Sequence, residues 1–242
     1  MSFREVPAAA SSLLTDLLSP GTSTAASPPL VELARTRVSV HYATGRDDVP
    51  VLCVATPDAV RLPASLLTTV LPTGELRVVA GVLQSATLRW PVTRWWRPSR
   101  PTGLTAPPSV PPLVGVDVPA TVEPDRLVGR GPGLTPLGDD VLAGALVAAH
   151  AVGDPRLGSW RAATLAALAA GRSTAVSRAL LHHARDGWAV PELADFVVAV
   201  CAGDATRAAG PLLRVGHTSG AGLAAGALHV LGSSARPERD AA

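Results

Sequence analysis

The chain contains no lysine, because all 21 of its basic residues are arginines. This absence excludes a lysine Schiff base, a lysine nucleophile and the phosphate-binding lysine of a P-loop. Unless a metal ion is bound, any cation that meets a phosphate or a carboxylate here must be an arginine or a histidine. The sequence therefore has to build an anion site from guanidinium groups and backbone N–H groups.

Cysteine and long apolar runs are also scarce. Cys53 and Cys201 lie far apart in short apolar segments, so we expect buried thiols rather than a disulfide or a metal-binding pair. No run is long enough and free enough of charge to cross a bilayer, and the N-terminus lacks the pattern of a secretory signal. We therefore expect a cytoplasmic protein without a membrane partner.

Charge is low and nearly balanced, with a formal net charge of +2 and 17% charged residues. This composition provides no extended basic surface of the kind that binds nucleic acid. The tandem tryptophans in Arg94–Arg97 can stack on a base or another flat ligand. The balanced charge instead favours a β edge whose tryptophans pack against protein, and we expect no nucleic-acid partner.

The pattern of apolar residues predicts an α+β fold, with a β-rich N-terminal unit followed by an all-helical C-terminal domain. Residues 1–97 are predicted to form an N-terminal helix over 7–19 and a small antiparallel β unit. Strands are expected near 37–42, 51–55, 76–82 and 85–92. Residues 98–124 form a proline-rich connector, residues 125–235 a helical domain, and residues 236–242 a disordered tail.

Glycines and prolines mark where the helices of the helical domain are expected to begin and end. Its expected helices span 139–152, 159–170, 174–185, 191–201, 205–209 and 219–231. Many of their residues are alanine or glycine, which permits close approach between helices.

The stretch from Leu127 to Gly144 combines a glycine-rich loop with the start of a helix. Gly129, Gly131 and Gly133 surround one proline, and Asp139 and Asp140 follow at the helix N-terminus. A loop of this kind can expose backbone N–H groups, and a helix N-terminus favours negative charge. The stretch thus predicts a site for a small anion.

Two further junctions between a loop and a helix have the same character, at 171–174 and at 216–220. Convergence of the three junctions would form an anion site without lysine. The alternative is that the hydroxyl residues only cap helices. The residues we assign to a substrate or phosphate site are Arg130, Gly131, Gly133, Thr135, Arg172, Ser173, Thr174, Thr218, Ser219 and Gly220.

Three residues are candidates for catalysis. Asp139 and Asp140 can hold Mg²⁺ against a phosphate, and His217 is the most suitable general acid or base. Alternatively, the two carboxylates only interact with the positive end of the helix dipole, and His217 is a packed residue. We expect no cofactor other than Mg²⁺.

The same segments resemble the AllH-type family, which includes a subunit of oxamate carbamoyltransferase from bacterial allantoin breakdown. The family pattern Gly-x-Gly-Pro-Gly-Leu-Thr-Pro-x-Gly-Asp-Asp is present in full from Gly129 to Asp140. Ser173-Thr174 and the segment Gly216–Gly220 match weaker parts of it. The pattern often has an aspartate two residues after Gly220, where this chain has Gly222.

This resemblance implies a transferase subunit of purine (allantoin) catabolism. Its implied ligands are oxalurate, oxamate, carbamoyl phosphate and phosphate, and its implied partners are the other subunits of a carbamoyltransferase complex. The alternative is a non-catalytic subunit that uses the same site to bind a small anion or to support assembly.

Overall fold

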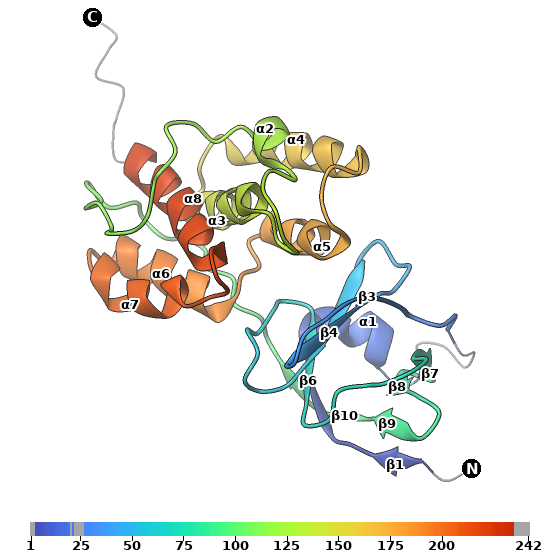
Figure 1. Ribbon diagram of the computed structural model, residues 1–242. Coiled ribbons are helices and arrows are strands. Elements are labelled where there is room, and N and C mark those ends of the chain that lie inside the picture. The colour runs from blue at the N-terminus through green and yellow to red at the C-terminus, as the bar shows by residue number, and fades with distance from the viewer. Residues whose placement is uncertain (1–2, 20, 22–26, 235–242) are drawn as a thin grey trace, which may run out of the picture. The chain divides into compact units, whose positions relative to one another are not determined.

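The computed structural model describes residues 3–19, 21 and 27–234 (Figure 1). The chain divides into two compact units, Met1–Pro98 and Ser99–Ala242. The first contains the β-sheets and the second contains the long helices, which confirms the predicted α+β class. The expected tail at 236–242 lies outside the described residues.

The larger sheet of the first unit has six strands in the order β10-β2-β6-β5-β4-β3. They span Val92–Trp96, Ala8–Ser11, Ser65–Thr68, Val51–Ala55, Ser39–Ala43 and Val31–Arg35. Alternation along these strands decides which side chains enter the core, since successive residues point to opposite faces. Val40 and Tyr42 of β4, with Leu52 and Val54 of β5, lie in the hydrophobic core. The opposite face carries small and polar residues, among them Cys53.

A smaller sheet completes the first unit, with strands in the order β1-β9-β8-β7. They span Arg4–Glu5, Leu88–Trp90, Val82–Gln84 and Arg77–Val79. Trp90 is fully buried, and its indole N–H donates to the carbonyl of Val70 at 2.9 Å. This one bond satisfies the polar atom of the largest core side chain of the unit.

Two expectations for the β unit were wrong in detail. Residues 8–11 form strand β2 rather than the start of a helix, and only Ser12–Leu14 (η1) and Thr15–Leu18 (α1) are helical. The alanines of β2 pair with β10 on one side and β6 on the other, so tertiary pairing overrides their helix propensity. The unit is also mixed rather than simply antiparallel, because β2 pairs in parallel with β10 and β5 with β6.

The second unit contains seven α-helices within its described residues. They are α2 (Pro124–Leu127), α3 (Leu137–Val152), α4 (Leu157–Ala169), α5 (Ala175–Ala184), α6 (Pro191–Cys201), α7 (Ala205–Leu213) and α8 (Ser219–Ser234). Each expected helix is present, and the largest difference is that α7 continues past Ala209 through Pro211. No helix in the described ranges has the length and apolar character needed to cross a membrane.

The proline-rich segment after Pro98 packs on these helices. The N–H of Leu104 donates to the carbonyl of Ala151 at 2.9 Å, and that of Ala189 donates to the carbonyl of Ser99 at 2.9 Å. His229 of α8 is hydrogen-bonded through Nδ1 to the carbonyl of Pro119 at 2.9 Å. Most of the segment is therefore part of the helical unit.

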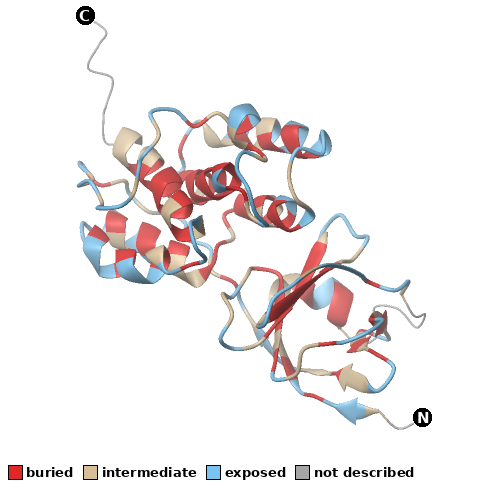
Figure 2. Ribbon diagram, in the orientation of Figure 1, coloured by how far each residue is buried: buried red, intermediate tan, exposed pale blue. Residues whose placement is uncertain are grey.

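Helix α3 lies at the centre of the second unit and is buried along almost its whole length (Figures 1 and 2). It packs most extensively against α8. The two helices approach so closely that a Cβ on Gly144 would lie 2.0 Å from the carbonyl oxygen of Leu223. A Cβ on Gly226 would lie 1.8 Å from the carbonyl oxygen of Val141. Glycine is therefore required at both positions of this contact.

Replacing Gly226 with alanine is expected to destabilise the second unit by more than about 3 kcal/mol, because the new methyl group meets backbone rather than a movable side chain. The control is Gly232→Ala in the same helix, where a Cβ would meet no atom within 4 Å. That change should be neutral or stabilise by about 0.5–1 kcal/mol. Urea unfolding followed by circular dichroism measures both; equal stability of the two variants would contradict the packing.

Candidate functional site

The glycine-rich loop leaves α2 at Leu127 and enters α3 at Leu137. Gly129, Gly131 and Gly133 have φ values of +76°, +117° and +97°, which other residues rarely adopt. Gly129 is also confined, since a Cβ there would lie 1.6 Å from the carbonyl oxygen of Arg172. The glycines thus allow the loop to reverse direction and to pass directly against the segment that precedes α5.

Asp139 holds this loop to the helices. Its side chain is 1% exposed. One carboxylate oxygen accepts the N–H of Gly129 at 2.7 Å. The other accepts the hydroxyl of Ser177 at 2.7 Å and the hydroxyl of Ser173. A carboxylate saturated by three donors in this way is a fixed structural element that joins the loop, α3 and α5.

Two other hydroxyl contacts bring the remaining junction to the same place. The Thr135 and Ser219 hydroxyls lie 3.0 Å apart, which links the loop to the first residue of α8. Thr174 donates its hydroxyl to the carbonyl of Leu134 at 2.6 Å, and the same oxygen caps α5 by accepting the N–H of Ser177 at 3.0 Å. The three junctions expected from the sequence are therefore joined by direct hydrogen bonds.

Asp140 differs from Asp139 although the two residues are adjacent. It is 5% exposed, and its Oδ2 atom has no hydrogen-bond partner within the described part of the chain. Burial raises the pKa of Asp140 to about 7, the Ser219 hydroxyl lowers this pKa, and the charge of Asp139 raises it. Near neutral pH the carboxyl group can therefore both hold and release a proton.

Gly222 of α8 lies directly against Asp140. A Cβ at this position would lie 2.9 Å from the Cβ of Asp140 and 2.9 Å from Cδ1 of Leu137. The aspartate that the family pattern often carries here would thus be adjacent to Asp140. In this chain the same space is closed by the helix backbone and by Leu137.

Mg²⁺ binding by Asp139 and Asp140 stays a prediction. Both oxygens of Asp139 accept hydrogen bonds, whereas Oδ2 of Asp140 has no hydrogen-bond partner in the described part of the chain. The residues that the structure describes contain no cluster of three or more His, Cys, Asp or Glu side chains able to hold a metal ion. The two acids therefore differ in role, with one holding the loop and the other buried with an unused oxygen.

The other predicted residues lie around the hydrogen-bonded cluster that Asp139 forms with Gly129, Ser173 and Ser177. Arg130, Gly131 and Gly133 are exposed on the loop, and the Arg172 guanidinium donates to the carbonyl of Asp125. Gly220 serves packing, since a Cβ there would lie 2.0 Å from the carbonyl oxygen of Leu212. His217 and Thr218 are exposed in the turn before α8, and neither side chain hydrogen-bonds the cluster.

Ser177 is part of the cluster although the sequence interpretation did not assign it to the site. It lies in the first turn of α5, four residues after Ser173, which precedes the cap residue Thr174. That spacing was a usable signal. The contact of Gly129 with Arg172, by contrast, depends on the tertiary fold, so no local sequence pattern predicts it.

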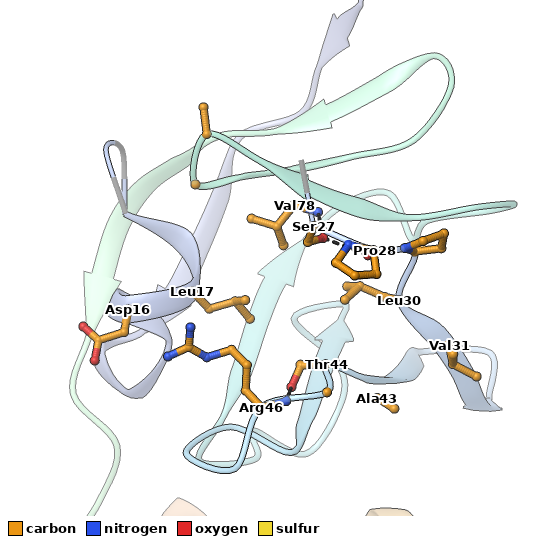
Figure 3. A pocket seen from close by; sticks show the side chains of 14 residues that line it. Asp16, Leu17, Ser27, Pro28, Leu30, Val31, Ala43, Thr44, Arg46 and Val78 are labelled. Atoms are coloured by element: carbon orange, nitrogen blue, oxygen red, sulfur yellow. Dashed lines mark hydrogen bonds between the residues drawn. The ribbon is translucent and has the colours of Figure 1, made fainter. Parts of the chain in front are cut away.

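Two cavities lie elsewhere in the molecule. One of about 590 Å³ lies between α6 and α7 and includes Glu192 and Arg207. The other, of about 610 Å³, lies in the β unit, where the Arg46 side chain extends toward Leu17 and Asp16 (Figure 3). Arg46 is already held by both carboxylate oxygens of Asp48, at 2.9 and 2.7 Å. Neither cavity is lined by residues of the glycine-rich loop.

The segment that forms this cluster was compared with known protein families. Residues 127–231 match the model of the oxamate carbamoyltransferase subunit AllH. Over these residues the helical unit is similar to that subunit. The match begins at the end of α2 and ends within α8, so it includes the loop, the two acids and all three junctions. It confirms the resemblance predicted from the motif. Comparison with curated proteins and with solved structures gives no match.

The two acids of the AllH-like motif are expected to respond differently to amide substitution. Asp139→Asn should destabilise the helical unit by roughly 2–4 kcal/mol, because the amide nitrogen would face a hydroxyl or N–H donor. Asp140→Asn at pH 7 should be neutral or stabilising, since it removes a buried charge and breaks no strong bond. Chemical unfolding of both variants tests this; a smaller loss for Asp139→Asn than for Asp140→Asn would contradict the structure.

The raised pKa of Asp140 also predicts a pH dependence. The folded protein binds the Asp140 proton more tightly than the unfolded chain, so the contribution to stability is largest below about pH 4 and is lost as the pH rises toward 7. The loss should be roughly 1.4 kcal/mol per pH unit across that window. Buried His183, whose pKa is lowered to about 4, acts in the opposite direction over part of the same range.

The appropriate measurement is therefore the difference between Asp140→Asn and the unmodified protein, from unfolding curves at several pH values. The variant should gain stability relative to the unmodified protein as the pH rises from 4 to 7. A difference that stays constant over this range would show that Asp140 has an ordinary pKa.

Proposed function

We propose that the helical unit binds a small carbamoyl or carboxylate compound together with phosphate, as a subunit of an oxamate carbamoyltransferase-type enzyme. The family match supports the class of protein. The arrangement of donors on the glycine-rich loop supports the class of ligand.

The observation that carries this proposal is a run of unpaired backbone donors. The N–H groups of Gly131, Gly133, Leu134, Thr135 and Leu137 have no acceptor among the described residues. Most of these residues are exposed, so the N–H groups can donate to a ligand. Backbone N–H groups beside a helix N-terminus favour anions such as phosphate and carboxylate.

The charges around the loop agree with this ligand class. Arg130 is exposed on the loop, and its guanidinium makes no hydrogen bond or ion pair with the residues that the structure describes. Its five N–H donors suit the oxygens of phosphate or carboxylate. The negative charge of Asp139 does not oppose binding strongly, since its oxygens already face one N–H group and two hydroxyls.

Carbamoyl transfer to phosphate makes two demands of a site. The site must hold a dianion close to a carbonyl group, and it must stabilise the charge that develops on the carbonyl oxygen. Fixed backbone N–H donors stabilise the charge on the carbonyl oxygen well, because they need no reorganisation during the reaction. The saturated contacts of Asp139 hold the loop in place for this purpose.

A non-catalytic anion-binding subunit is the second candidate. One of the two acids of the motif is fully occupied by structural hydrogen bonds, which leaves fewer free groups for chemistry than the sequence suggested. Measuring catalytic turnover distinguishes the catalytic subunit from the non-catalytic one. A subunit of the second kind would bind the anions and copurify with partner proteins, but the assembled complex would keep its rate when Asp140 is replaced.

Isothermal titration calorimetry with phosphate, carbamoyl phosphate and oxamate tests the proposed ligand class. The full chain should bind at least one of them, and Arg130→Gln should weaken binding about tenfold by removing a charged donor. Arg126→Gln is the matched control, because Arg126 is also exposed but is paired with Glu123 at 2.8 Å. Absence of binding to all three anions would refute the proposal.

A further inference from the structure

The cavity of about 610 Å³ in the β unit has no part in the proposed function (Figure 3). Every residue that lines it lies between Asp16 and Gly81, whereas the family match begins at residue 127. Its volume falls within the range of roughly 300–1,000 Å³ that is typical of pockets for small organic ligands. The cavity is therefore a candidate for a second binding site, separate from the glycine-rich loop.

Most of the cavity wall is apolar. It is formed by side chains of α1, of β7 and of the segment that leads into β3, among them Leu17, Pro28, Leu30, Val31 and Val78. Leu17, Leu30 and Val78 are at most 8% exposed and belong to the hydrophobic core, so the fold fixes their positions. Val31 is 63% exposed, and contact with an apolar group would remove its surface from water. The wall thus favours a ligand with an apolar chain.

Asp16 and Arg46 contribute opposite charges to this otherwise apolar lining. The Arg46 side chain extends toward Asp16 (Figure 3). The two groups are close enough to interact, since hydrogen bonds to Asp48 raise the pKa of Arg46 most and the charge of Asp16 raises it further. A ligand that carries both a positive and a negative group would complement the pair.

Both charged side chains keep unused hydrogen-bonding capacity. Arg46 donates from Nε and Nη2 to the two oxygens of Asp48, at 2.9 and 2.7 Å, which leaves Nη1 without an acceptor among the described residues. The Asp16 carboxylate forms no hydrogen bond or ion pair with that part of the chain. A ligand carboxylate can therefore accept from Nη1 of Arg46 while a ligand ammonium group donates to Asp16.

The turn between β7 and β8 places a strained residue at the cavity. Ala80 has a φ of +49°, which alanine rarely adopts, and Gly81 follows it with a φ of +77°. Both residues line the cavity. Tight turns with two successive positive φ values usually have Asn, Asp or Gly at the first of these positions. Alanine keeps the wall free of a polar side chain at a cost in backbone strain, and strain of this kind is often found at ligand sites.

We propose that this cavity binds an α-amino acid with an apolar side chain, its carboxylate on Nη1 of Arg46 and its ammonium group on Asp16. The apolar side chain lies against Leu17, Leu30 and Val78. An α-amino acid carries its two charged groups on one carbon atom, which suits two opposite protein charges that lie side by side. The proposal does not depend on the proposed function of the helical unit.

Isothermal titration calorimetry of the full chain with four compounds tests the two charges and the apolar wall separately. L-leucine should bind. Leucinamide lacks the carboxylate, 4-methylpentanoate lacks the ammonium group and glycine lacks the side chain. Each should bind at least about tenfold more weakly, the loss expected for one charged hydrogen bond or one aliphatic side chain. Absence of leucine binding, or equal affinity for leucine and glycine, would overturn the proposal.

Variants of the two charged residues test how the ligand is placed. Arg46→Gln should weaken the binding of L-leucine about tenfold without weakening that of leucinamide, which has no carboxylate to lose. Asp16→Asn should weaken the binding of leucinamide without weakening that of 4-methylpentanoate, which has no ammonium group. A purely structural role of either residue would not produce this dependence on the ligand. The same loss for every compound would overturn the proposal.

Two exposed residues of the same unit provide matched controls. Arg35 pairs with both oxygens of Glu32, at 2.9 and 2.6 Å, in the way that Arg46 pairs with Asp48, but it does not line the cavity. Asp58 is exposed after β5 and also lies outside the lining. Arg35→Gln and Asp58→Asn should therefore keep the affinity for L-leucine, and a loss equal to that in the cavity variants would contradict the assignment.

Arg130→Gln separates this site from the glycine-rich loop. The variant should bind L-leucine as the unmodified chain does, because Arg130 does not line the cavity. Weaker binding of leucine in this variant would place the amino acid at the loop and would overturn the proposed cavity site. The proposed function is tested by phosphate, carbamoyl phosphate and oxamate instead, so either proposal can fail without the other.

Discussion

The site depends on one buried carboxylate, that of Asp139. The helical unit must bring together a flexible glycine-rich loop and the first turns of two helices, none of which is fixed by its own local structure. Asp139 connects the N–H of Gly129 with the hydroxyls of Ser173 and Ser177, so a single side chain on α3 sets the position of both other segments. Hydrogen bonds to a charged acceptor are stronger than neutral ones, and burial keeps water from competing for them. Without this carboxylate the loop would lose its hydrogen bond at Gly129 and its link through Ser173 and Ser177 to the start of α5.

Glycine provides the second constraint, because it lets backbones meet where side chains would otherwise separate them. Gly144 and Gly226 allow α3 and α8 to pack backbone against backbone, and Gly222 extends the same contact to Asp140. The close approach places the first turn of α8, with Ser219, beside the loop residue Thr135. The alanine-rich and glycine-rich composition of these helices thus has a functional consequence. It places the Ser219 hydroxyl 3.0 Å from the Thr135 hydroxyl of the glycine-rich loop.

Much of this could be read from the sequence, and the failures have physical causes. The helical boundaries followed from glycine and proline, and Pro191–Cys201 was predicted to the residue because proline begins it and Gly203 follows it. The continuous apolar run predicts strand β5. The helical spacing of the leucines at 13–18 predicts a helix that wrongly includes the three alanines of β2. The position of the acid pair at the start of α3 was predictable, but the different contacts of the two carboxyl groups were not. Adjacent residues of a helix point in different directions, and only the packing of α5 and α8 determines which carboxylate meets hydroxyl donors.

That division explains how two neighbouring acids can be kept in one apolar helix. Two buried carboxylates side by side would repel each other, and the repulsion is reduced when one is neutral. Three donors converge on Asp139. Burial, and to a smaller extent the charge of Asp139, raise the pKa of Asp140 to about 7. The two neighbouring acids thus have different surroundings: Asp139 holds the loop, and Asp140 keeps a buried oxygen without a hydrogen-bond partner in the described part of the chain.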